Sequence, residues 1–313
     1  MKSTIKIAAE TILNGGLVGM PTETVYGLAA DATNDQAVAS VFDVKGRPSF
    51  NPLICHVASL DMARAIGEFD AISETLATAF WPGPLTLVVR KKHEAPLSLL
   101  VTAGLDTVAI RLPAHPIAQE LIKAVGRPVA APSANRSGTI SPTRADHVEK
   151  SLGKKVPVIV DGGPTEVGLE STILRVIDGD VTLLRSGGID RKAIERVAGQ
   201  PLSKPKDKTI QSPGMMRSHY APATPLRINA ANPSATEAFL DFGEMHTDHD
   251  IRLDLSASGD MREAAANLFA HLHSLDVTCQ KNAIAGIAVA PVPHTGLGEA
   301  INDRLKRAAT PEK

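Results

Sequence analysis

The chain has 313 residues, of which 43% are hydrophobic, 21% charged and 3% aromatic, and its formal net charge is −1 at pH 7. This length suits one large or two modest domains, and the composition excludes a disordered, collagen-like or coiled-coil protein. The near-neutral charge and scarce aromatic residues argue against a surface built for nucleic acid. Two cysteines, Cys55 and Cys279, are too few for a disulfide framework or a four-thiolate zinc site.

Residues 1–200 alternate short apolar runs with segments of helical periodicity, which predicts a layered α/β domain. A first helix begins near Ile5 and ends at the stop signal 14–16. Further helices are predicted after the capping residue Asn34 and over 73–80, 115–125, 144–152 and 191–198. Strands are predicted over 17–20, 53–57, 85–90, 108–112, 129–131, 156–160, 172–177 and 181–184. Because short connections join several of these strands, we expect a mixed sheet.

Residues 201–224 have the composition of a linker, since their first part is polar and rich in Pro and Lys. Residues 225–313 then predict a smaller α/β domain. Its expected strands are 226–228, 251–255 and 284–290, and its expected helices are 235–242, 261–275 and 297–307. No stretch approaches the roughly 20 apolar residues of a membrane span and no secretory signal pattern is present, so we expect a cytoplasmic protein.

Two loops in the first 60 residues carry groups that suit an anionic or polar ligand. Thr22 lies in a hydroxyl-rich loop directly after a strand, a common place for a ligand, although such side chains also stabilise turns. Lys45 and Arg47 are two residues apart beside Gly and Pro, which suits a rigid phosphate cradle or a solvated helix end. His56 alternates with Cys55 on a strand, so one of the two faces inward, and the histidine is either a base or a structural group.

Three later segments add polar side chains at strand ends. Ser133 and Asn135 are two residues apart and can donate to phosphate or ribose, or form a helix cap. Arg111 stands in an otherwise apolar strand and needs an anionic partner, either Glu170 or a substrate. Arg185 precedes a glycine pair, which suits a buried anion contact. The common glycine-rich nucleotide fingerprints are absent from the sequence, and no cluster of carboxylates is present to bind a metal.

Taken together, these segments resemble the YrdC-like threonylcarbamoyl-AMP synthases, in the longer two-domain form of that family. The resemblance runs in order from about residue 5 to residue 224, and its hallmark is the Lys-x-Arg and Ser-x-Asn pairs. The segments that carry it are 21–28, 45–48, 51–54 with His56, 81–86, 107–113, 131–135, 184–187, 212–215 and 219–222. It implies an open, twisted α/β sheet with a large positive cavity.

The resemblance also implies a reaction and the residues that serve it. L-threonine, bicarbonate and ATP would give threonylcarbamoyl-AMP and pyrophosphate with Mg²⁺ carried by the triphosphate, and other tRNA-modifying proteins would use the product. The implied ATP contacts are Lys45 and Arg47, which also act in catalysis, and Asn51, Thr107, Ser133, Asn135, Ser141, Arg185 and Tyr220. The implied threonine contacts are Thr22, His56, Arg111 and Ser171, with Arg111 taking the carboxylate. Ala131 departs from members that have a hydroxyl there.

The resemblance also extends to the linker. Residues 212–220 match the linker of the longer forms, which covers the cavity, although composition alone favours an exposed tether.

Two other classes of protein stay open at this point. One is the related carbamoyl-handling enzymes of hydrogenase maturation, whose acylphosphatase and Cys-rich segments this chain lacks. The other is an RNA-binding module without catalysis, which the near-neutral charge disfavours.

Overall fold

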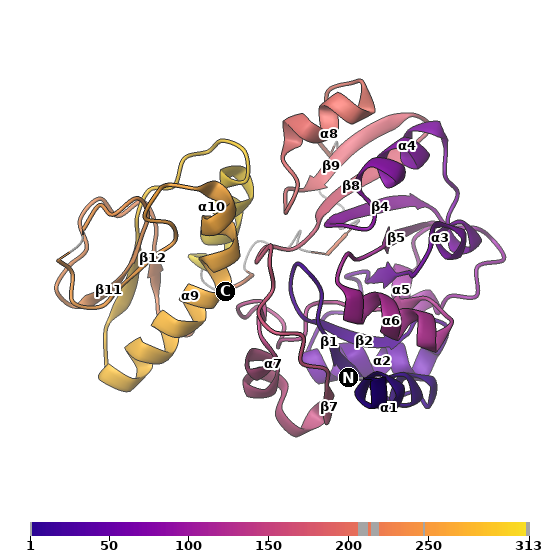
Figure 1. Ribbon diagram of the computed structural model, residues 1–313, viewed down its shortest axis with the longest axis horizontal. Coiled ribbons are helices and arrows are strands. Elements are labelled where there is room, and N and C mark those ends of the chain that lie inside the picture. Colours follow the sequence, from indigo (N-terminus) through magenta and orange to yellow (C-terminus); the bar gives the residue numbers. More distant parts are fainter. Residues whose placement is uncertain (1, 206–211, 214–218, 247, 311–313) are drawn as a thin grey trace.

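The computed structural model describes residues 2–205, 212–213, 219–246 and 248–310. These residues form a large lobe around a nine-stranded sheet and a small lobe around a four-stranded sheet (Figure 1). The expected fold class, a mixed α/β sheet with a smaller C-terminal α/β domain, is confirmed. None of the helices in the described part of the chain has the length and apolar character that a membrane crossing requires.

The large sheet has the strand order β7-β1-β2-β6-β3-β5-β4-β8-β9 and mixes parallel with antiparallel neighbours. Its strands are β1 (Val18–Met20), β2 (Gly27–Asp31), β3 (Ile54–His56), β4 (Leu85–Arg90), β5 (Thr107–Arg111), β6 (Val129–Ala130), β7 (Val158–Ile159), β8 (Thr172–Ile177) and β9 (Asp180–Arg185). All strands predicted in this lobe are present, and their observed ends lie within two residues of the predicted ends. Strand β2 was not predicted, because its first two residues fall in the loop expected at 21–28.

Helices cover the large sheet in two groups. Helices α1 (Lys2–Leu13) and α6 (Pro116–Val125) pack together and share one apolar cluster with β1. The largest apolar cluster receives residues from α2 (Asp35–Lys45), α3 (Leu60–Ile66), α4 (Ala71–Phe80), α5 (Leu99–Thr102), α7 (Ala145–Leu152) and α8 (Arg191–Ala198). A short 3₁₀ helix (Gly153–Lys155) follows α7. Asn34 caps α2 as expected, since its side chain accepts hydrogen bonds from two backbone N–H groups.

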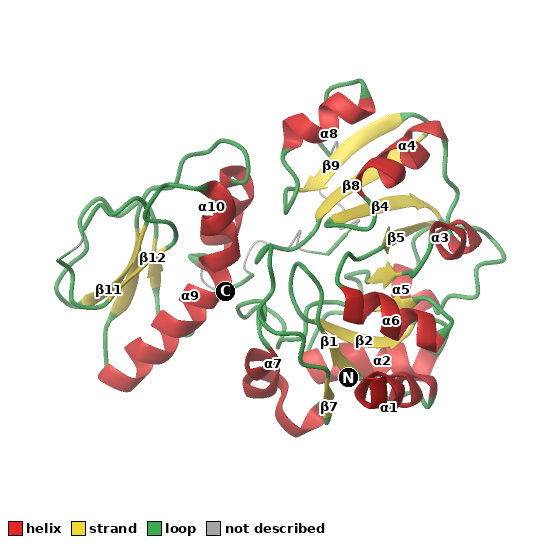
Figure 2. Cartoon of the chain, viewed as in Figure 1, coloured by secondary structure: helices red, strands yellow, loops and turns green. Residues whose placement is uncertain are grey.

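The small lobe has a parallel sheet of order β10-β13-β11-β12 and two helices (Figure 2). These elements are β10 (Leu226–Arg227), β11 (Glu237–Asp241), β12 (Arg252–Asp254), α9 (Met261–Asn282), β13 (Gly286–Val289) and α10 (Gly298–Ala308). The helix predicted over 235–242 is wrong, because this segment is β11. Four of its five residues are buried and it pairs on both sides, so the pairing overrides the helical preference of Ala, Glu and Leu.

The two lobes meet through α9 and α10, which lie on the side of the small lobe that faces the large one (Figure 1). One apolar cluster combines the core of the small lobe with Val25, Ile140 and Leu169 of the large lobe and with Tyr220 of the linker. Gly168 shows how close the approach is, because a methyl group there would lie 2.5 Å from the backbone of α9. The interface is therefore packed as a protein interior.

Candidate active site

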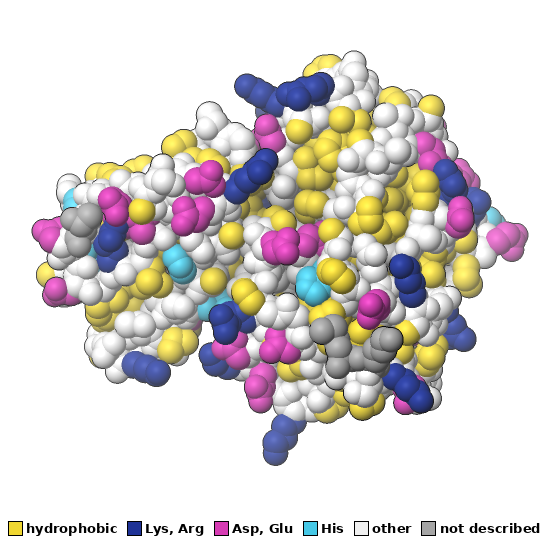
Figure 3. Space-filling model, in the orientation of Figure 1, with side chains coloured by type: hydrophobic (Ala, Val, Ile, Leu, Met, Phe, Trp, Pro, Cys, Tyr) yellow, Lys and Arg dark blue, Asp and Glu magenta, His cyan; other side chains and the backbone are white. Residues whose placement is uncertain are grey.

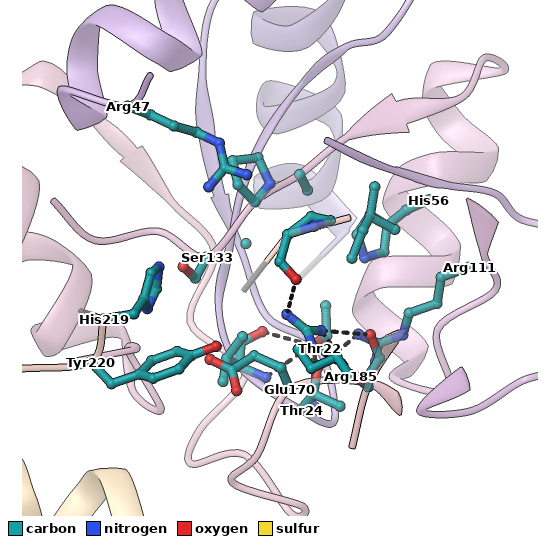
Figure 4. A pocket seen from close by; sticks show the side chains of 17 residues that line it. Thr22, Thr24, Arg47, His56, Arg111, Ser133, Glu170, Arg185, His219 and Tyr220 are labelled. Atoms are coloured by element: carbon teal, nitrogen blue, oxygen red, sulfur yellow. Dashed lines mark hydrogen bonds between the residues drawn. The ribbon is translucent and has the colours of Figure 1, made fainter. Parts of the chain in front are cut away.

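A pocket lies between the large sheet and the described linker residues, with about 550 Å³ of atom-free space including the solvent at its mouth. Its lining comprises Thr22, Thr24, Val25, Gly27, Arg47, Ile54, His56, Arg111, Ala131, Pro132, Ser133, Glu170, Ser171, Arg185, Pro213, His219 and Tyr220. Figure 4 shows Arg47, Ser133, His219 and Tyr220 along one side of this pocket, and His56 and Arg111 along the other. Two sets of polar side chains thus face one space.

Strand register places His56 and Arg111 next to each other. The two residues are partners in the parallel β3–β5 pair, so their side chains leave the sheet on the same side. Cys55 points to the opposite side and is buried in the largest apolar cluster. Of these two neighbouring residues, His56 is therefore the one that faces the pocket.

Arg111 is buried and fixed by three neighbours. One guanidinium nitrogen lies 2.7 Å from Glu23 Oε1, a second donates to Thr24 Oγ1 at 2.8 Å, and Nε donates to the carbonyl of Gly83. Burial raises the pKa of Glu23, but the charge and hydrogen bond of Arg111 outweigh it and lower that pKa overall. The prediction that Glu170 could be the partner of Arg111 is wrong, because Glu170 pairs with Arg304. Arg111 thus presents a rigid cation at the pocket wall.

His56 is a neutral imidazole with spare hydrogen-bonding capacity. Burial, together with the nearby charge of Arg111, lowers the pKa of His56 to about 3. Its Nδ1 atom is buried and has no hydrogen-bond partner among the described residues. A ligand in the pocket can satisfy this atom, which otherwise carries the cost of an unpaired buried polar group.

Thr22 is buried, stabilises a turn and also lines the pocket. Its hydroxyl donates to the carbonyl of Val25 at 2.6 Å and lies 2.8 Å from Thr24 Oγ1, so it stabilises the turn that the sequence analysis gave as the alternative. The hydroxyl of Ser171 lies 2.7 Å from Thr86 Oγ1, and Ser171 accepts hydrogen bonds from Arg185 through both its hydroxyl and its carbonyl.

Arg185 and Arg47 supply the other buried cations of the lining. Arg185 donates to the carbonyl of Ser171 through two nitrogens, and a third donates to the carbonyl of Pro213 in the linker at 3.3 Å. Arg47 donates to the carbonyls of Asn51 and Pro52. Burial lowers the pKa of Arg47 to about 10, so it stays protonated at neutral pH. Each guanidinium is therefore held in place by backbone carbonyls before any ligand binds.

Five predicted contacts do not line this pocket. Lys45 Nζ donates to the carbonyls of Ser133 and Asn135, and thereby joins the end of α2 to the loop after β6. Burial and the charge of Arg47 lower the pKa of Lys45 well below its ordinary value. Asn51 contributes a carbonyl to Arg47. Lys45 and Asn51 therefore support residues of the lining without belonging to it.

The other three are also absent from the lining. Asn135 donates its side-chain amide to the carbonyls of Arg136 and Thr139, although its Oδ1 is buried and has no hydrogen-bond partner in the part of the chain that the structure describes. Ser141 donates its hydroxyl to Glu170 at 2.6 Å. Thr107 begins β5, four residues before Arg111 and thus about 13 Å away along the strand. In this conformation the pocket does not bring Thr107 together with the other predicted contacts.

The described part of the linker forms one wall of the pocket through Pro213, His219 and Tyr220. Tyr220 has φ +67°, a left-handed conformation that is rare for a bulky residue, and its ring packs against His219 and Phe269. Burial lowers the pKa of His219 to about 3. The rest of the predicted lid, residues 214–218, lies outside the described residues.

Several residues of the site were not predicted from the sequence. Glu23 and Thr24 stand inside the loop that was singled out, so that loop was the available signal. Arg304 of α10 carried no local signal at all. Among the described residues, no group of three or more His, Cys, Asp or Glu side chains is placed to hold a metal ion.

Family models match nearly the whole chain. A model described as "Telomere recombination", covering the Sua5, YciO and YrdC proteins, matches residues 10–187, and a model described as "Threonylcarbamoyl-AMP synthase, C-terminal domain" matches residues 189–310. The chain belongs to the threonylcarbamoyl-AMP synthase family. It is therefore a member of an enzyme family, as the motifs had indicated.

Relatives and solved structures agree with this assignment. The chain is 42% identical to the threonylcarbamoyl-AMP synthase of Bacillus subtilis over 96% of this chain and 92% of that one. It is 39% identical to the enzyme of the same name from Pyrococcus abyssi, over 97% and 94%. The crystal structure of P. abyssi Sua5 complexed with L-threonine superposes with a TM-score of 0.88 at 38% identity, over 97% of this chain and 94% of that chain. Full-length HypF, at 21% identity and a TM-score of 0.53 over 60% of this chain and 29% of that chain, shares the fold alone.

Proposed function

We propose that this protein makes threonylcarbamoyl-AMP and pyrophosphate from L-threonine, bicarbonate and ATP in the pocket described above. The observation that supports it is that Arg47, Ser133 and Arg185 face the same space as His56 and Arg111. Arg47, Arg185 and Ser133 offer two fixed cations and a hydroxyl for a nucleoside triphosphate. Arg111 and His56 offer a cation and an imidazole for an amino acid. The name of the P. abyssi structure, a complex with L-threonine, supports the amino acid.

The proposed chemistry needs positioning more than covalent catalysis. The amine nitrogen of threonine forms a bond to the carbon of bicarbonate, with loss of water, and gives a carbamate. A carbamate oxygen then attacks the α-phosphorus of ATP while the bond to pyrophosphate breaks. We assign Arg111 to the threonine carboxylate, and Arg47 and Arg185 to the phosphate oxygens, whose charge grows as pyrophosphate leaves. Cations held in place beforehand stabilise that charge without reorganising.

We propose that Mg²⁺ enters with the triphosphate. Carboxylates are the usual protein ligands of this ion. Glu170 lines the pocket but is engaged with Arg304, and Glu23 is engaged with the lining residue Arg111. The described residues therefore offer no ready carboxylate site for a resident metal, and no step above is assigned to one.

We also propose that the protein works in the cytoplasm and that other proteins transfer its product to tRNA. On the face shown in Figure 3, Lys and Arg side chains lie among Asp and Glu rather than in one continuous patch. A mixed surface of this kind gives little of the electrostatic attraction that nucleic acid binding requires. The cations that the proposal uses are those inside the pocket.

Release of pyrophosphate from ATP tests the proposed function. We expect release only when threonine and bicarbonate are both present, and threonylcarbamoyl-AMP as the second product. Serine should be a poorer substrate because it lacks the methyl group, and valine much poorer because a site that binds a hydroxyl leaves polar groups unpaired around it. Equal rates with threonine and valine, or release without bicarbonate, would contradict the proposal.

A further inference from the structure

Arg304, on α10 of the small lobe, is one of the most deeply buried side chains of the described structure. Its side chain has no exposed surface. Nε donates to Glu170 Oε2 at 2.9 Å, one terminal nitrogen donates to the carbonyl of Ser186 at 2.8 Å, and the other donates to Asp303 at 2.8 Å. Burying an arginine costs free energy unless such partners are present. These three hydrogen bonds offset that cost and fix the position of the Arg304 guanidinium.

The partner of Arg304 belongs to the pocket. Glu170 lines it, and its second carboxylate oxygen accepts the hydroxyl of Ser141. The guanidinium of Arg304 also lies 5.3 Å from the centre of the ring of Tyr220, which is another lining residue. A residue of the second domain therefore contacts two walls of a pocket that it does not itself line.

The charges of the lining explain what this contact does. Its cations are Arg47, Arg111 and Arg185, and Arg111 is already paired with Glu23. Glu170 lies close enough to Arg185 for each charge to affect the other. If Arg304 were absent, the Glu170 carboxylate would have Arg185 as its nearby cation in a site with little water. It would then compete with any anionic ligand for that cation and would repel the ligand.

We propose that Arg304 is a positioning residue through which the second domain sets the affinity of the pocket for ATP. By neutralising Glu170, it leaves Arg185 and Arg47 available to the phosphate groups. This inference rests on the proposed function, because it takes ATP to be the anionic ligand. It assigns the small lobe a role in substrate binding rather than in stability alone.

Four variants test the inference in the full-length protein: Arg304→Met, Glu170→Gln, the double variant of both, and Arg191→Gln. The last is the matched control, because it breaks another ion pair between the large lobe and α10, that of Arg191 on α8 with Glu299 at 2.6 Å, and neither residue lines the pocket. For each variant, circular dichroism and thermal unfolding check the fold. Initial rates of pyrophosphate release then give KM for ATP, KM for threonine and kcat.

We expect Arg304→Met to raise KM for ATP about tenfold, a usual size for coupling between two sites, while KM for threonine changes by less than about twofold. Glu170→Gln should not raise KM for ATP. The double variant should return KM for ATP to within about threefold of the wild type, because neither charge remains. Arg191→Gln should leave all three constants unchanged.

A pH series adds a measurement that a purely structural role would not change. In Arg304→Met the loss of the guanidinium should raise the pKa of Glu170, so lowering the pH should protonate Glu170 more readily and reduce KM for ATP, whereas the double variant should follow the wild type. If Arg304→Met does not fold, the double variant still decides: weak ATP binding in a folded double variant overturns the inference. Equal rises in both KM values, or a rise for Glu170→Gln, also overturn it. Failure of the proposed function is distinct, since the wild type would then show no release dependent on all three substrates.

Discussion

Gly168 is the point at which the closeness of the two lobes can be measured. Its φ is +69°, and a methyl group there would lie 2.5 Å from both Ala265 O and Ala266 Cα of α9. Gly199, which ends α8, has almost the same φ of +68°, but a methyl group there would meet nothing within 4 Å. The two glycines therefore share the backbone requirement and differ only in the space around them.

This difference sets the magnitudes for Gly168→Ala and Gly199→Ala. A left-handed conformation costs a residue with a Cβ about 1–2 kcal/mol, and both variants carry this cost. Overpacking adds about 1–3 kcal/mol at Gly168 alone, because the contact is with helix backbone that cannot rotate away. We therefore expect a loss in the free energy of unfolding of about 2–5 kcal/mol for Gly168→Ala and about 1–2 kcal/mol for Gly199→Ala.

Urea unfolding followed by circular dichroism measures both losses under the same conditions. Gly168→Ala should also raise KM for ATP, since Gly168 is two residues before Glu170 and any shift of α9 disturbs the wall formed with Tyr220. Equal destabilisation by the two substitutions would show that the lobes do not approach as closely as described.

Two further predictions concern the pocket. Arg47→Ala should reduce kcat/KM by about 30- to 1,000-fold, equivalent to about 2–4 kcal/mol of lost transition-state stabilisation. Arg47→Lys should recover only part of this activity, because lysine lacks the planar guanidinium fork. Near-normal turnover of Arg47→Ala at saturating ATP would exclude a role of Arg47 in stabilising the phosphate charge. Burial raises the pKa of Glu170, but Arg304, Arg185 and Ser141 lower it overall to about 2, against an unfolded value of 4.5. The stability that Glu170 contributes is therefore complete above pH 4.5 and is lost as the pH falls toward 2, on the order of 3 kcal/mol at about 1.4 kcal/mol per pKa unit. Unfolding free energies measured from pH 6 to pH 3 should fall more steeply for the wild type than for Glu170→Gln, and parallel curves would contradict this.

Most of the fold could be predicted from the sequence because its elements carry strong local patterns. Strands β4 and β8 and helix α8 begin and end where the periodicity changes. Segment 235–242 failed for a physical reason, since its residues favour a helix locally and only the pairing with β12 and β13 makes it a strand. β2 was missed because Gly27 and Leu28 were taken as part of a ligand loop.

The site divides in the same way. The residues that line the pocket through a motif, such as Arg47, His56 and Ser133, could be named from the sequence. Their partners could not, because ion pairing depends on distance in space. Glu170 and Arg304 are 134 residues apart and belong to different lobes, and no spacing rule connects them.

The apolar cluster shared by the lobes has a consequence for how the molecule comes apart. Val25, Ile140 and Leu169 of the large lobe are buried against the core of the small one. A fragment that ends at Gly199 would lose this cover and expose these apolar side chains, which would favour aggregation. The two lobes should therefore unfold in one cooperative transition, in which neither half survives the loss of the other unchanged.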